Sequence, residues 1–373
     1  MAPLRILQVC LSPSWGGLEM SAARFTEVLT KRGHACSCLC LQGSRLHLEL
    51  NERGQEALPL RVMKYFSPPG SLRIRALVRH REVQIVHCHH LSDLWLLVPA
   101  LWGLSEVKLF GTLRVYFTKL KKRDVAHRLI YRRLETLFTT TEIAKNAMAK
   151  NLPLRPERIS VLPNGVDLSI FNPNGYSRRD IREELGLREE DFVIGLVARI
   201  NPGKGQLELV RAAKKLKQKY PGLKYLLVGE ITLGEGQEHK RMIEDLISES
   251  GLSENFILSG FREDIPRVLK ALDLFVIPSY QETFGNTALE AMAMGIPIIA
   301  TDAGGLPEIL ADCGLLIPPR QSQPLAEAIE FMTEEPDKPS QLAKKARRRV
   351  EEVYDQEVIF GKLEQIYSQS LEN

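Results

Sequence analysis

Short apolar and β-branched segments alternate with longer, helical segments along almost the whole chain of 373 residues. The apolar segments have the length of single strands, and the segments between them carry apolar residues at helical spacing. Alternation of strand and helix predicts parallel sheets whose strands are connected by helices. The fold class is therefore α/β, with doubly wound, Rossmann-like sheets.

This alternation occurs twice, which predicts one sheet in each half of the chain. Between residues 163 and 175 Pro, Gly and Asn cluster directly after a predicted strand, and we place the linker there. The predicted domains are residues 1–170 and 171–355, followed by a closing helix over 356–373 that is free to cross back to the first domain. The expected strands are Arg5–Cys10, Ala35–Leu41, Gln84–His87, Lys108–Gly111, Leu137–Thr140 and Ile159–Leu162, then Phe192–Ala198, Leu223–Val228, Phe256–Leu258, Leu274–Ile277 and Ile296–Thr301.

Composition excludes several classes of protein. With 44% hydrophobic and 26% charged residues, the chain resembles an ordinary soluble globular protein and not a disordered, collagen-like or disulfide-stapled one. The longest apolar run, Leu94–Leu104, is well short of the roughly 20 residues that span a bilayer. The amino terminus is typical of a buried strand and not of a signal peptide, and Cys36, Cys38 and Cys40 alternate as structural thiols do. We expect a cytoplasmic protein.

Charge is divided unevenly. Residues 1–170 contain 25 Lys+Arg and 13 Asp+Glu, a net charge of +12, whereas the remainder has a net charge of −8. The basic half favours an anionic partner: a lipid surface, a phosphorylated acceptor or nucleic acid. Bases mix with apolar residues at 72–79, 117–123 and 128–133, which indicates either an anionic membrane surface or solvated helix faces. Nucleic acid explains them poorly, because no recognised binding module accompanies the charge.

Two facing doubly wound domains form an interdomain cleft at the carboxyl ends of their sheets, where such folds bind nucleotides. No G-x-G-x-x-G follows the first predicted strand, and no G-x-x-x-x-G-K-[ST] occurs. These absences disfavour a dinucleotide dehydrogenase and a P-loop phosphoryl transfer enzyme.

Two cations stand in a glycine-containing loop of the second half. Arg199 and Lys204 follow an apolar strand and precede a helix, and the nearby glycines allow the backbone to approach a ligand closely. Each buried, charge-assisted hydrogen bond contributes roughly 1.5–3 kcal/mol, so the two bases suit a diphosphate. The alternative is a surface loop with two solvated bases.

A pair of carboxylates marks the next candidate site. Glu282 lies in the loop after the strand 274–277, and Glu290 lies one turn into the following helix. The glycine of this loop and the free N–H groups at the helix start form an anion site. Ionised carboxylates accept hydrogen bonds from sugar hydroxyls, so a phosphate at the helix start would leave both glutamates facing hydroxyl groups.

An ordered series of motifs along almost the whole chain resembles the family-four retaining glycosyltransferases of the GT-B fold, a group that includes bacterial cell-envelope and lipopolysaccharide enzymes. Two segments depart from the family. Many relatives carry a histidine after the strand equivalent to Lys108–Gly111, where this chain has residues 111–114 without one, and Glu230 follows Gly229 without the second glycine that is common in the family. The matching segments are 16–19, 86–89, 159–167, Arg199 with Lys204, 260–261, 278–279, 282–290 and 303–308.

The resemblance implies a role for each matched residue. It implies that Arg199 and Lys204 bind the donor diphosphate, that Glu290 binds the ribose and that Glu282 contacts the transferred sugar. It also implies that His89 faces this sugar. Glycines of the first loop would approach the phosphate, and main-chain amides after Glu282 would hold sugar and phosphate; these residues are Gly16, Gly17, Phe284, Gly285 and Asn286.

The implied mechanism is retention by front-face attack, in which the departing diphosphate takes the acceptor proton. Neither a cofactor nor a metal ion is expected, since Arg199, Lys204 and a helix start would neutralise the leaving group. The histidines of 87–90 do not form a ligand set, because neighbouring side chains on a strand point to opposite faces.

The function implied first is transfer of a hexose from a nucleotide sugar, UDP-linked, to a lipid-linked or lipopolysaccharide acceptor. The enzyme would then work at the inner face of the cytoplasmic membrane as a peripheral protein. One alternative is a small soluble acceptor such as a sugar phosphate or inositol phosphate. The other is a nucleotide-sugar-binding subunit without turnover, which the intact basic and acidic site residues disfavour.

Overall fold

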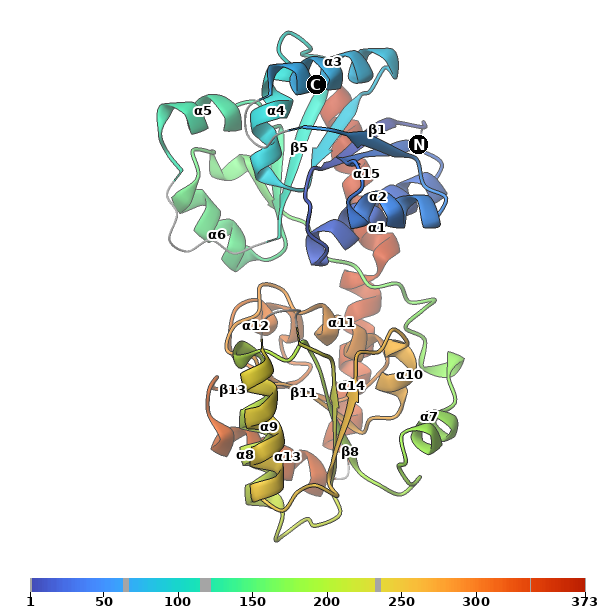
Figure 1. Ribbon diagram of the computed structural model, residues 1–373, viewed down its shortest axis with the longest axis vertical. Helices are drawn as coiled ribbons and strands as arrows, with labels where there is room; N and C mark the ends of the chain where they lie inside the picture. Colours follow the sequence, from blue (N-terminus) through green and yellow to red (C-terminus); the bar gives the residue numbers. More distant parts are fainter. Residues whose placement is uncertain (1, 63–66, 115–121, 232–235, 336, 373) are drawn as a thin grey trace. The chain divides into compact units, whose positions relative to one another are not determined.

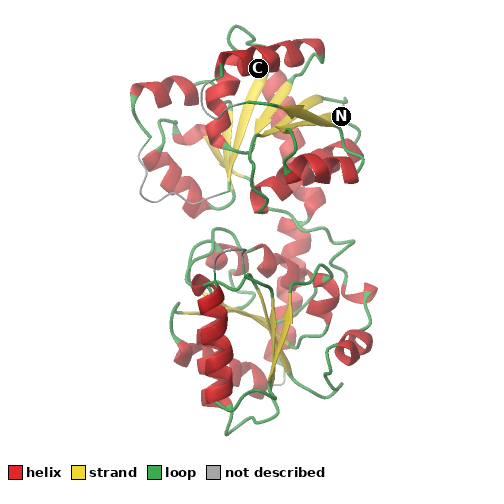
Figure 2. Cartoon of the chain, in the orientation of Figure 1, coloured by secondary structure: helices red, strands yellow, loops and turns green. Residues whose placement is uncertain are grey.

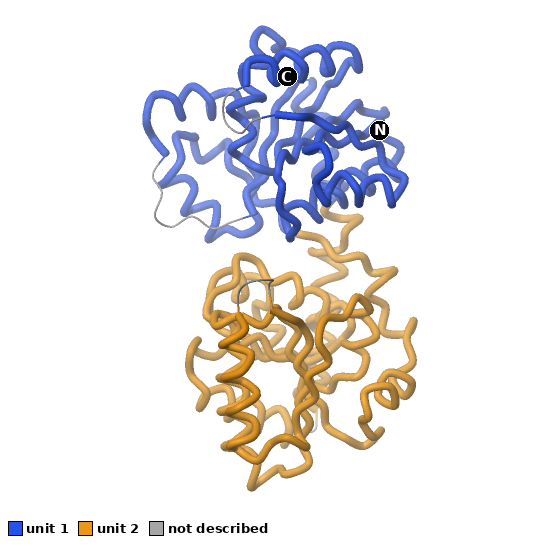
Figure 3. Tube along the Cα trace, in the orientation of Figure 1, with its two compact units in different colours: residues 1–163, 360–373 blue, residues 164–359 orange. Residues whose placement is uncertain are grey.

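The structure is a computed structural model that describes residues 2–62, 67–114, 122–231, 236–335 and 337–372 (Figure 1). The chain divides into two compact units (Figure 3). Unit 1 comprises residues 1–163 and 360–373, and unit 2 comprises residues 164–359. The division therefore falls at 163/164, ahead of the expected boundary at 170/171, and the end of the closing helix belongs to unit 1.

Unit 1 contains a parallel sheet of seven strands, in the order β3-β2-β1-β4-β5-β6-β7. The order reverses direction between β1 and β4, the point at which open α/β sheets bind ligands outside the carboxyl ends of their strands. The strands are β1 (Arg5–Cys10), β2 (Ala35–Leu41), β3 (Ala57–Leu60), β4 (Ile85–Cys88), β5 (Lys108–Leu113), β6 (Thr136–Thr139) and β7 (Ile159–Val161).

Helices flank this sheet and bury an apolar core (Figure 2). Their first turns are fixed by caps typical of helix starts: Ser44, Ser67, Asp124 and Thr141 each accept a main-chain N–H. The helices are α1 (Gly17–Lys31), α2 (Arg45–Glu52), α3 (Pro68–His80), α4 (Leu94–Ala100), α5 (Val125–Tyr131) and α6 (Glu142–Asn151), and α15 (Gln356–Glu372) returns to the unit from residue 360.

Unit 2 contains a parallel sheet of six strands in the order β10-β9-β8-β11-β12-β13. Its direction reverses between β8 and β11, so the loops after these two strands are the expected ligand loops. The strands are β8 (Val193–Val197), β9 (Lys224–Val228), β10 (Phe256–Gly260), β11 (Leu274–Ile277), β12 (Ile298–Thr301) and β13 (Leu315–Ile317).

Helices cover both faces of this second sheet and bury one apolar cluster on each face. One cluster includes residues of α8, α9 and α13, and the other includes residues of α11, α14 and the π-helical turn η5. The helices are α7 (Arg178–Glu184), α8 (Gln206–Leu216), α9 (Gln237–Glu249), α10 (Ile265–Lys270), α11 (Asn286–Ala293), α12 (Leu306–Leu310), α13 (Ser322–Glu334), α14 (Lys338–Arg349) and η5 (Val350–Tyr354).

The prediction of two doubly wound parallel sheets is confirmed. Two edge strands were missed: β3 contains Pro59, which is tolerated only at a sheet edge or a bulge, and β13 has three residues. All six cysteines are buried free thiols, and burial raises the pKa of Cys36 to about 12 and of Cys40 to about 11. Among the described residues, the helices are too short or too polar to cross a membrane.

The three basic stretches of the sequence differ in where they lie and in whether the structure describes them. Residues 72–79 lie in α3, where Leu72, Arg73 and Arg79 are exposed. Residues 128–133 lie in α5 and just beyond it, and Leu129 is 64% exposed. The stretch 117–123 lies outside the described residues except for its last two.

Candidate functional site

The loops after β8 and β11 contact each other at the switch point of the unit 2 sheet. Tyr280 donates its main-chain N–H to the carbonyl of Gly203 over 2.8 Å. Gly205 has a φ of +76°, and a Cβ at that residue would lie 2.1 Å from the carbonyl oxygen of Pro278. Only glycine fits this close approach, so the loop that carries Arg199 and Lys204 is fixed against the loop that carries Glu282.

Lys204 and Glu282 form an ion pair between these loops. Lys204 Nζ lies 2.5 Å from Glu282 Oε1, and Ser279 Oγ donates to the same oxygen over 2.9 Å. Both charged side chains are partly exposed, at 25% and 17%. Two side chains that lie 78 residues apart thus present a cation and an anion at one point, where a phosphate can compete for the lysine and a hydroxyl for the carboxylate.

Arg199 is exposed at the end of β8, close to this pair along the chain. Its main-chain carbonyl accepts a hydrogen bond from Gln206 Nε2 over 2.9 Å. This bond fixes the backbone of the loop, and because the residue is exposed an anion can reach it.

The start of α11 holds the other predicted donor residues. Gly285 precedes the helix with a φ of +108°, and a Cβ there would lie 2.8 Å from Leu306 Cδ2. Asn286 is exposed and accepts at Oδ1 from Asn164 Nδ2 over 2.7 Å, whereas Phe284 is buried against Tyr354. Only the main chain of Phe284 can therefore serve a ligand. Glu290 is half-buried one turn further on.

The segment 303–308, matched to the family without a role, supports Glu282. Gly304 has a φ of +63°, and a Cβ there would lie 1.7 Å from the carbonyl oxygen of Glu282. Gly305 donates its N–H to that oxygen over 3.0 Å, and Thr301 Oγ1 donates to the carbonyl of Ser279 over 2.6 Å. The loop after β12 thus fixes the backbone that carries Glu282, a role that the adjacent glycines signal but that only the fold reveals.

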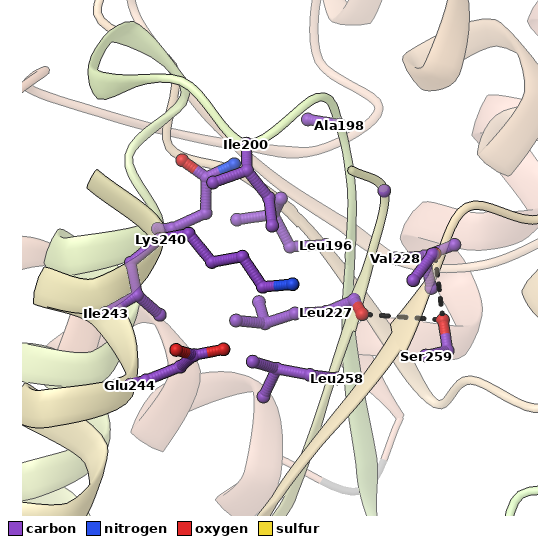
Figure 4. A pocket seen from close by; sticks show the side chains of 13 residues that line it. Leu196, Ala198, Ile200, Leu227, Val228, Lys240, Ile243, Glu244, Leu258 and Ser259 are labelled. Carbon is purple, nitrogen blue, oxygen red and sulfur yellow. Dashed lines mark hydrogen bonds between the residues drawn. The ribbon is translucent and has the colours of Figure 1, made fainter. Parts of the chain in front are cut away.

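A cavity of about 310 Å³ is lined by Ala198 and Ile200, the two neighbours of Arg199 along the chain (Figure 4). The ends of β8, β9 and β10 line it together with α9, and Leu196, Leu227 and Leu258 supply apolar walls. Lys240 points its amine into the cavity (Figure 4). Gln206 also lines it, is 1% exposed and has a buried Oε1 without a hydrogen-bond partner among the described residues. Sequence reasoning missed both polar residues.

The predicted glycines of unit 1 follow β1 at the switch point of that sheet. Gly16 caps α1 with extended backbone, and Gly17 is the first helical residue. Neither has a left-handed φ, so backbone strain does not demand glycine at either position. A Cβ at Gly17 would meet no atom within 4 Å, which leaves the space beside it open. Their approach to a phosphate stays a prediction.

His87 and His89, at the end of β4, stack on each other inside unit 1 with ring centres 4.8 Å apart. His87 contacts Tyr367 of α15 through Nδ1 and Thr112 Oγ1 through Nε2, the latter over 2.6 Å. His89 Nε2 lies 2.8 Å from Gln8 Oε1, and only 1% of the residue is exposed. The predicted role of His89 at the donor sugar requires the ligand to reach a nitrogen that is buried here.

Burial keeps these two rings neutral. It lowers the pKa of His87 to about 3, aided by nearby Arg114, and lowers the pKa of His89 well below its ordinary value. Among the described residues, His, Cys, Asp and Glu side chains form no cluster of three that could hold a metal ion.

Comparison with known families agrees with this architecture. The family model described as Glycosyltransferase Family 4 matches residues 15–170, in unit 1 and the start of unit 2. The family model described as Glycosyl transferases group 1 matches residues 177–349, in unit 2. The two matches together cover every strand except β1, and all the residues that the sequence predicts for the donor site.

One similar curated protein is a D-inositol 3-phosphate glycosyltransferase of Mycobacteroides abscessus, 31% identical over 279 residues. The match covers 70% of this chain and 60% of that protein, so the chain spans less than two thirds of the length of this relative.

Two solved structures have the same fold. A glycosyltransferase from Rickettsia africae superposes with a TM-score of 0.89 over 100% of both chains at 21% identity. Anabaena Alr3699/HepE in complex with UDP superposes with a TM-score of 0.86 over 98% of this chain and 100% of that one, at 23% identity. Together with the two family models, these likenesses show that the chain belongs to the family-four glycosyltransferases of the GT-B fold.

Proposed function

We propose that the protein transfers a hexose from a nucleoside diphosphate sugar to a small phosphorylated acceptor, such as a sugar phosphate or an inositol phosphate. The observation that carries this proposal is the pairing of Lys204 with Glu282 at the switch point of the unit 2 sheet. A cation and a carboxylate at one point match a donor that has a phosphate next to a sugar.

Binding of the donor would proceed by exchange of partners. The diphosphate would displace Glu282 from Lys204 and recruit the exposed guanidinium of Arg199, and the freed carboxylate would accept hydrogen bonds from the sugar. The main-chain amides at the start of α11 would hold the remaining oxygens, and Glu290 would accept from the ribose. Such charge-assisted bonds stabilise a leaving diphosphate as well as a bound one.

The cavity shown in Figure 4 fits the nucleobase. Its volume of about 310 Å³ and its leucine walls suit a flat ring. Gln206 Nε2 already donates to Arg199, so Oε1 faces away from that bond as an acceptor. A ring N–H would satisfy Oε1, and the amine of Lys240 would donate to a ring carbonyl. Uracil carries both groups and so does guanine, whereas adenine has no ring carbonyl, so the cavity favours a UDP- or GDP-linked donor over an ADP-linked one.

The choice of acceptor follows two observations. The net charge of +12 on residues 1–170 attracts a phosphorylated acceptor, and the curated relative carries an inositol phosphate in its name. This reverses the order of the sequence analysis, which placed a lipid-linked or lipopolysaccharide acceptor first. The donor site of unit 2 is the same for a soluble and for a lipid-linked acceptor. Its intact ion pair of Lys204 and Glu282 argues against a subunit without turnover.

We infer a retaining, metal-independent reaction. Lys204, Arg199 and the start of α11 would neutralise the diphosphate without a divalent cation, and the diphosphate would accept the proton of the attacking hydroxyl. Glu282 would position the sugar, and His89 would face the sugar only after its buried Nδ1 is uncovered. Product analysis by NMR would reveal the anomer, and activity should persist in excess chelator.

The test is a screen of UDP-, GDP- and ADP-sugars against inositol phosphate, hexose phosphates and lipid-linked acceptors. Lys204→Ala should weaken nucleoside diphosphate binding by 10- to 100-fold, because it removes one charge-assisted hydrogen bond worth roughly 1.5–3 kcal/mol. The exposed Lys214 of α8 provides a matched control, and Lys214→Ala should bind as wild type does. Equal binding by both variants would place the donor elsewhere.

A lipid-linked acceptor is the second candidate, and one surface favours it. Trp102 is 78% exposed and Leu72 is 66% exposed, and Arg75 of α3 donates to the carbonyl of Trp102. An exposed tryptophan beside exposed bases is typical of a protein that lies on a membrane surface as a peripheral protein. Activity that requires anionic vesicles would favour this candidate over a soluble acceptor.

A further inference from the structure

Unit 2 contains a second cavity, of about 510 Å³, that the proposed donor site does not use. Its walls come from the loop after β8, the first turns of α8 and α9, and Tyr280 in the loop after β11. Apolar contacts are offered by Ile200, Pro202, Leu207 and Met242. The volume lies within the range of about 300–1,000 Å³ that is common for small-molecule sites.

A buried carboxylate supports one wall of this cavity. Glu208 of α8 is 5% exposed, and its Oε1 accepts from the hydroxyl of Tyr280 over 2.9 Å and from Arg211 Nη1 over 3.1 Å. Its Oε2 is buried and has no hydrogen-bond partner among the described residues. A buried polar oxygen without a partner is costly, so the cluster is incomplete as it stands.

An imidazole on α9 also has a buried polar atom without a hydrogen-bond partner. His239 lines the cavity, is 7% exposed, and has a buried Nε2 without a hydrogen-bond partner in the described chain. Burial lowers its pKa, and nearby Glu208 offsets this only in part, so the ring is neutral at pH 7. A neutral imidazole nitrogen either donates or accepts one hydrogen bond.

The chemistry of the lining restricts what can bind. A phosphate or carboxylate would meet the lining carboxylate of Glu238, with the carboxylate of Glu208 behind Tyr280. A metal ion is disfavoured, because the described His, Cys, Asp and Glu side chains form no group of three that could hold one. A cationic ligand is not needed to neutralise Glu208, because Arg211 already forms an ion pair with it. What remains is a neutral molecule with hydroxyl groups and an apolar face.

We propose that this cavity binds a neutral saccharide unit other than the donor sugar. One hydroxyl would exchange a hydrogen bond with His239 Nε2, and a second would donate to the hydroxyl oxygen of Tyr280, which Glu208 holds in the wall. The C–H face of the ring would pack on Pro202 and Met242. The saccharide would thereby give the unpartnered imidazole a hydrogen-bond partner.

Such a site would act on the donor loops directly. Pro202 lies in the loop that carries Arg199 and Lys204, and Tyr280 lies two residues before Glu282. The main-chain bond from Tyr280 to Gly203 connects the same two loops. A bound saccharide would restrict both loops and so favour donor binding, which makes the two ligands thermodynamically coupled.

The test uses free D-glucose, D-galactose and N-acetyl-D-glucosamine as probes, titrated into the full chain and followed by saturation-transfer NMR. At least one sugar should bind wild type, and binding should weaken at least tenfold in His239→Leu. Met242→Trp fills the cavity from a residue that is 48% exposed and should weaken binding as much without disturbing the fold. Met20 of unit 1, which is 51% exposed, gives the matched control Met20→Trp.

Glu282→Ala separates this site from the donor site. Sugar binding that persists in Glu282→Ala and fails in Met242→Trp supports the proposal. Loss in Glu282→Ala with retention in Met242→Trp would assign the sugar to the donor site and overturn it. Absence of sugar binding in the folded wild type would leave ordered water as the partner of His239 Nε2 and also overturn it. Nucleoside diphosphate binding by Met242→Trp should persist, so the proposed function is judged separately.

Discussion

The two units place polar side chains at the same topological position, the reversal of strand order in a parallel sheet, but expose them differently. In unit 2 the ion pair of Lys204 and Glu282 is partly exposed on loops that glycines fix. In unit 1 the corresponding strand end carries His87 and His89, which are sealed inside. Topology thus positions a polar group at the end of a strand, and the packing around it decides whether a ligand can reach it.

The cause of the difference in unit 1 is an aromatic cover. The ring of Phe25, from α1, lies edge-on to both histidines at 5.4 and 5.1 Å and also contacts Phe360 of α15. Tyr367 of the same helix contacts His87. A partly buried ion pair holds α15 in this position, because Arg32 donates twice to the carboxylate of Glu364 over 2.7 and 2.8 Å.

The largest effect is expected at Gly304 of unit 2, where the neighbouring backbone leaves no space for a side chain. In Gly304→Ala the new Cβ would lie 1.7 Å from the main-chain oxygen of Glu282, a contact that no side-chain rotation relieves. The loop must move and carry Glu282 with it, so turnover should fall at least 100-fold, measured as kcat/KM on the donor sugar.

Gly295 provides the control for this change. It also has a left-handed φ, of +67°, but a Cβ there would meet no atom within 4 Å. Gly295→Ala should cost only the backbone strain of about 1–2 kcal/mol in stability and leave turnover intact. Equal losses in both variants would mean that φ, and not the contact with Glu282, explains the glycine.

The sequence predicts where the charges of the unit 2 site lie because they stand in short loops next to recognisable strands, but it does not predict the contact that Gly304 makes with the backbone of Glu282. All strands of the central sheets except the edge strands β3 and β13 follow from apolar runs, and Arg199, Lys204 and Glu282 follow from their positions after such runs. Apolar runs locate the strands and therefore the loops that follow them. The doubly wound topology then places these loops side by side at the carboxyl edge of the sheet.

The sequence could not predict which polar residues would be buried together. Glu208, His239 and Tyr280 come from two helices and a loop, and no spacing connects them before the sheet is formed. Nor could alternation predict that Phe25 and Tyr367, far apart in the chain, would enclose His87. Such contacts depend on how helices pack across a sheet face, which local hydrophobic periodicity does not specify.

The second prediction concerns how the buried His87 and His89 make the stability of the protein depend on pH. The pKa of His87 is about 3 in the folded unit and 6.5 in the unfolded chain. As pH falls from 6.5 towards 3, the unfolded chain binds a proton that the folded unit does not. The free energy of unfolding should therefore decrease by up to about 1.4 kcal/mol per pH unit from this residue, and His89 adds in the same direction.

Calorimetric unfolding between pH 7 and pH 4 measures this dependence. His87→Gln retains a polar side chain that does not titrate, so its stability should depend less steeply on pH than that of wild type. The exposed His80 of α3 is the control, and His80→Gln should keep the wild-type slope. An unchanged slope in His87→Gln would show that the ring is not sealed in solution.

The smallest effect concerns the surface of unit 1 and leaves both polar sites untouched. If Trp102, Leu72 and the exposed bases of α3 rest on an anionic membrane, each base contributes about 1 kcal/mol, and salt weakens this attraction as the Debye length falls below about 10 Å at 0.1 M. The double variant Arg73→Glu, Arg79→Glu should then bind anionic vesicles roughly 30-fold or more weakly in sedimentation, since about 2 kcal/mol is lost even before repulsion. Trp102→Ala should weaken binding to a smaller extent, by removing the interfacial ring.

The control is a second double variant, Lys214→Glu with Lys215→Glu, which changes two exposed bases on α8 of unit 2. It makes the same change of charge away from α3 and should bind vesicles as wild type does. Equal weakening by both double variants would attribute vesicle binding to net charge alone, and no binding by wild type would leave α3 a solvated face.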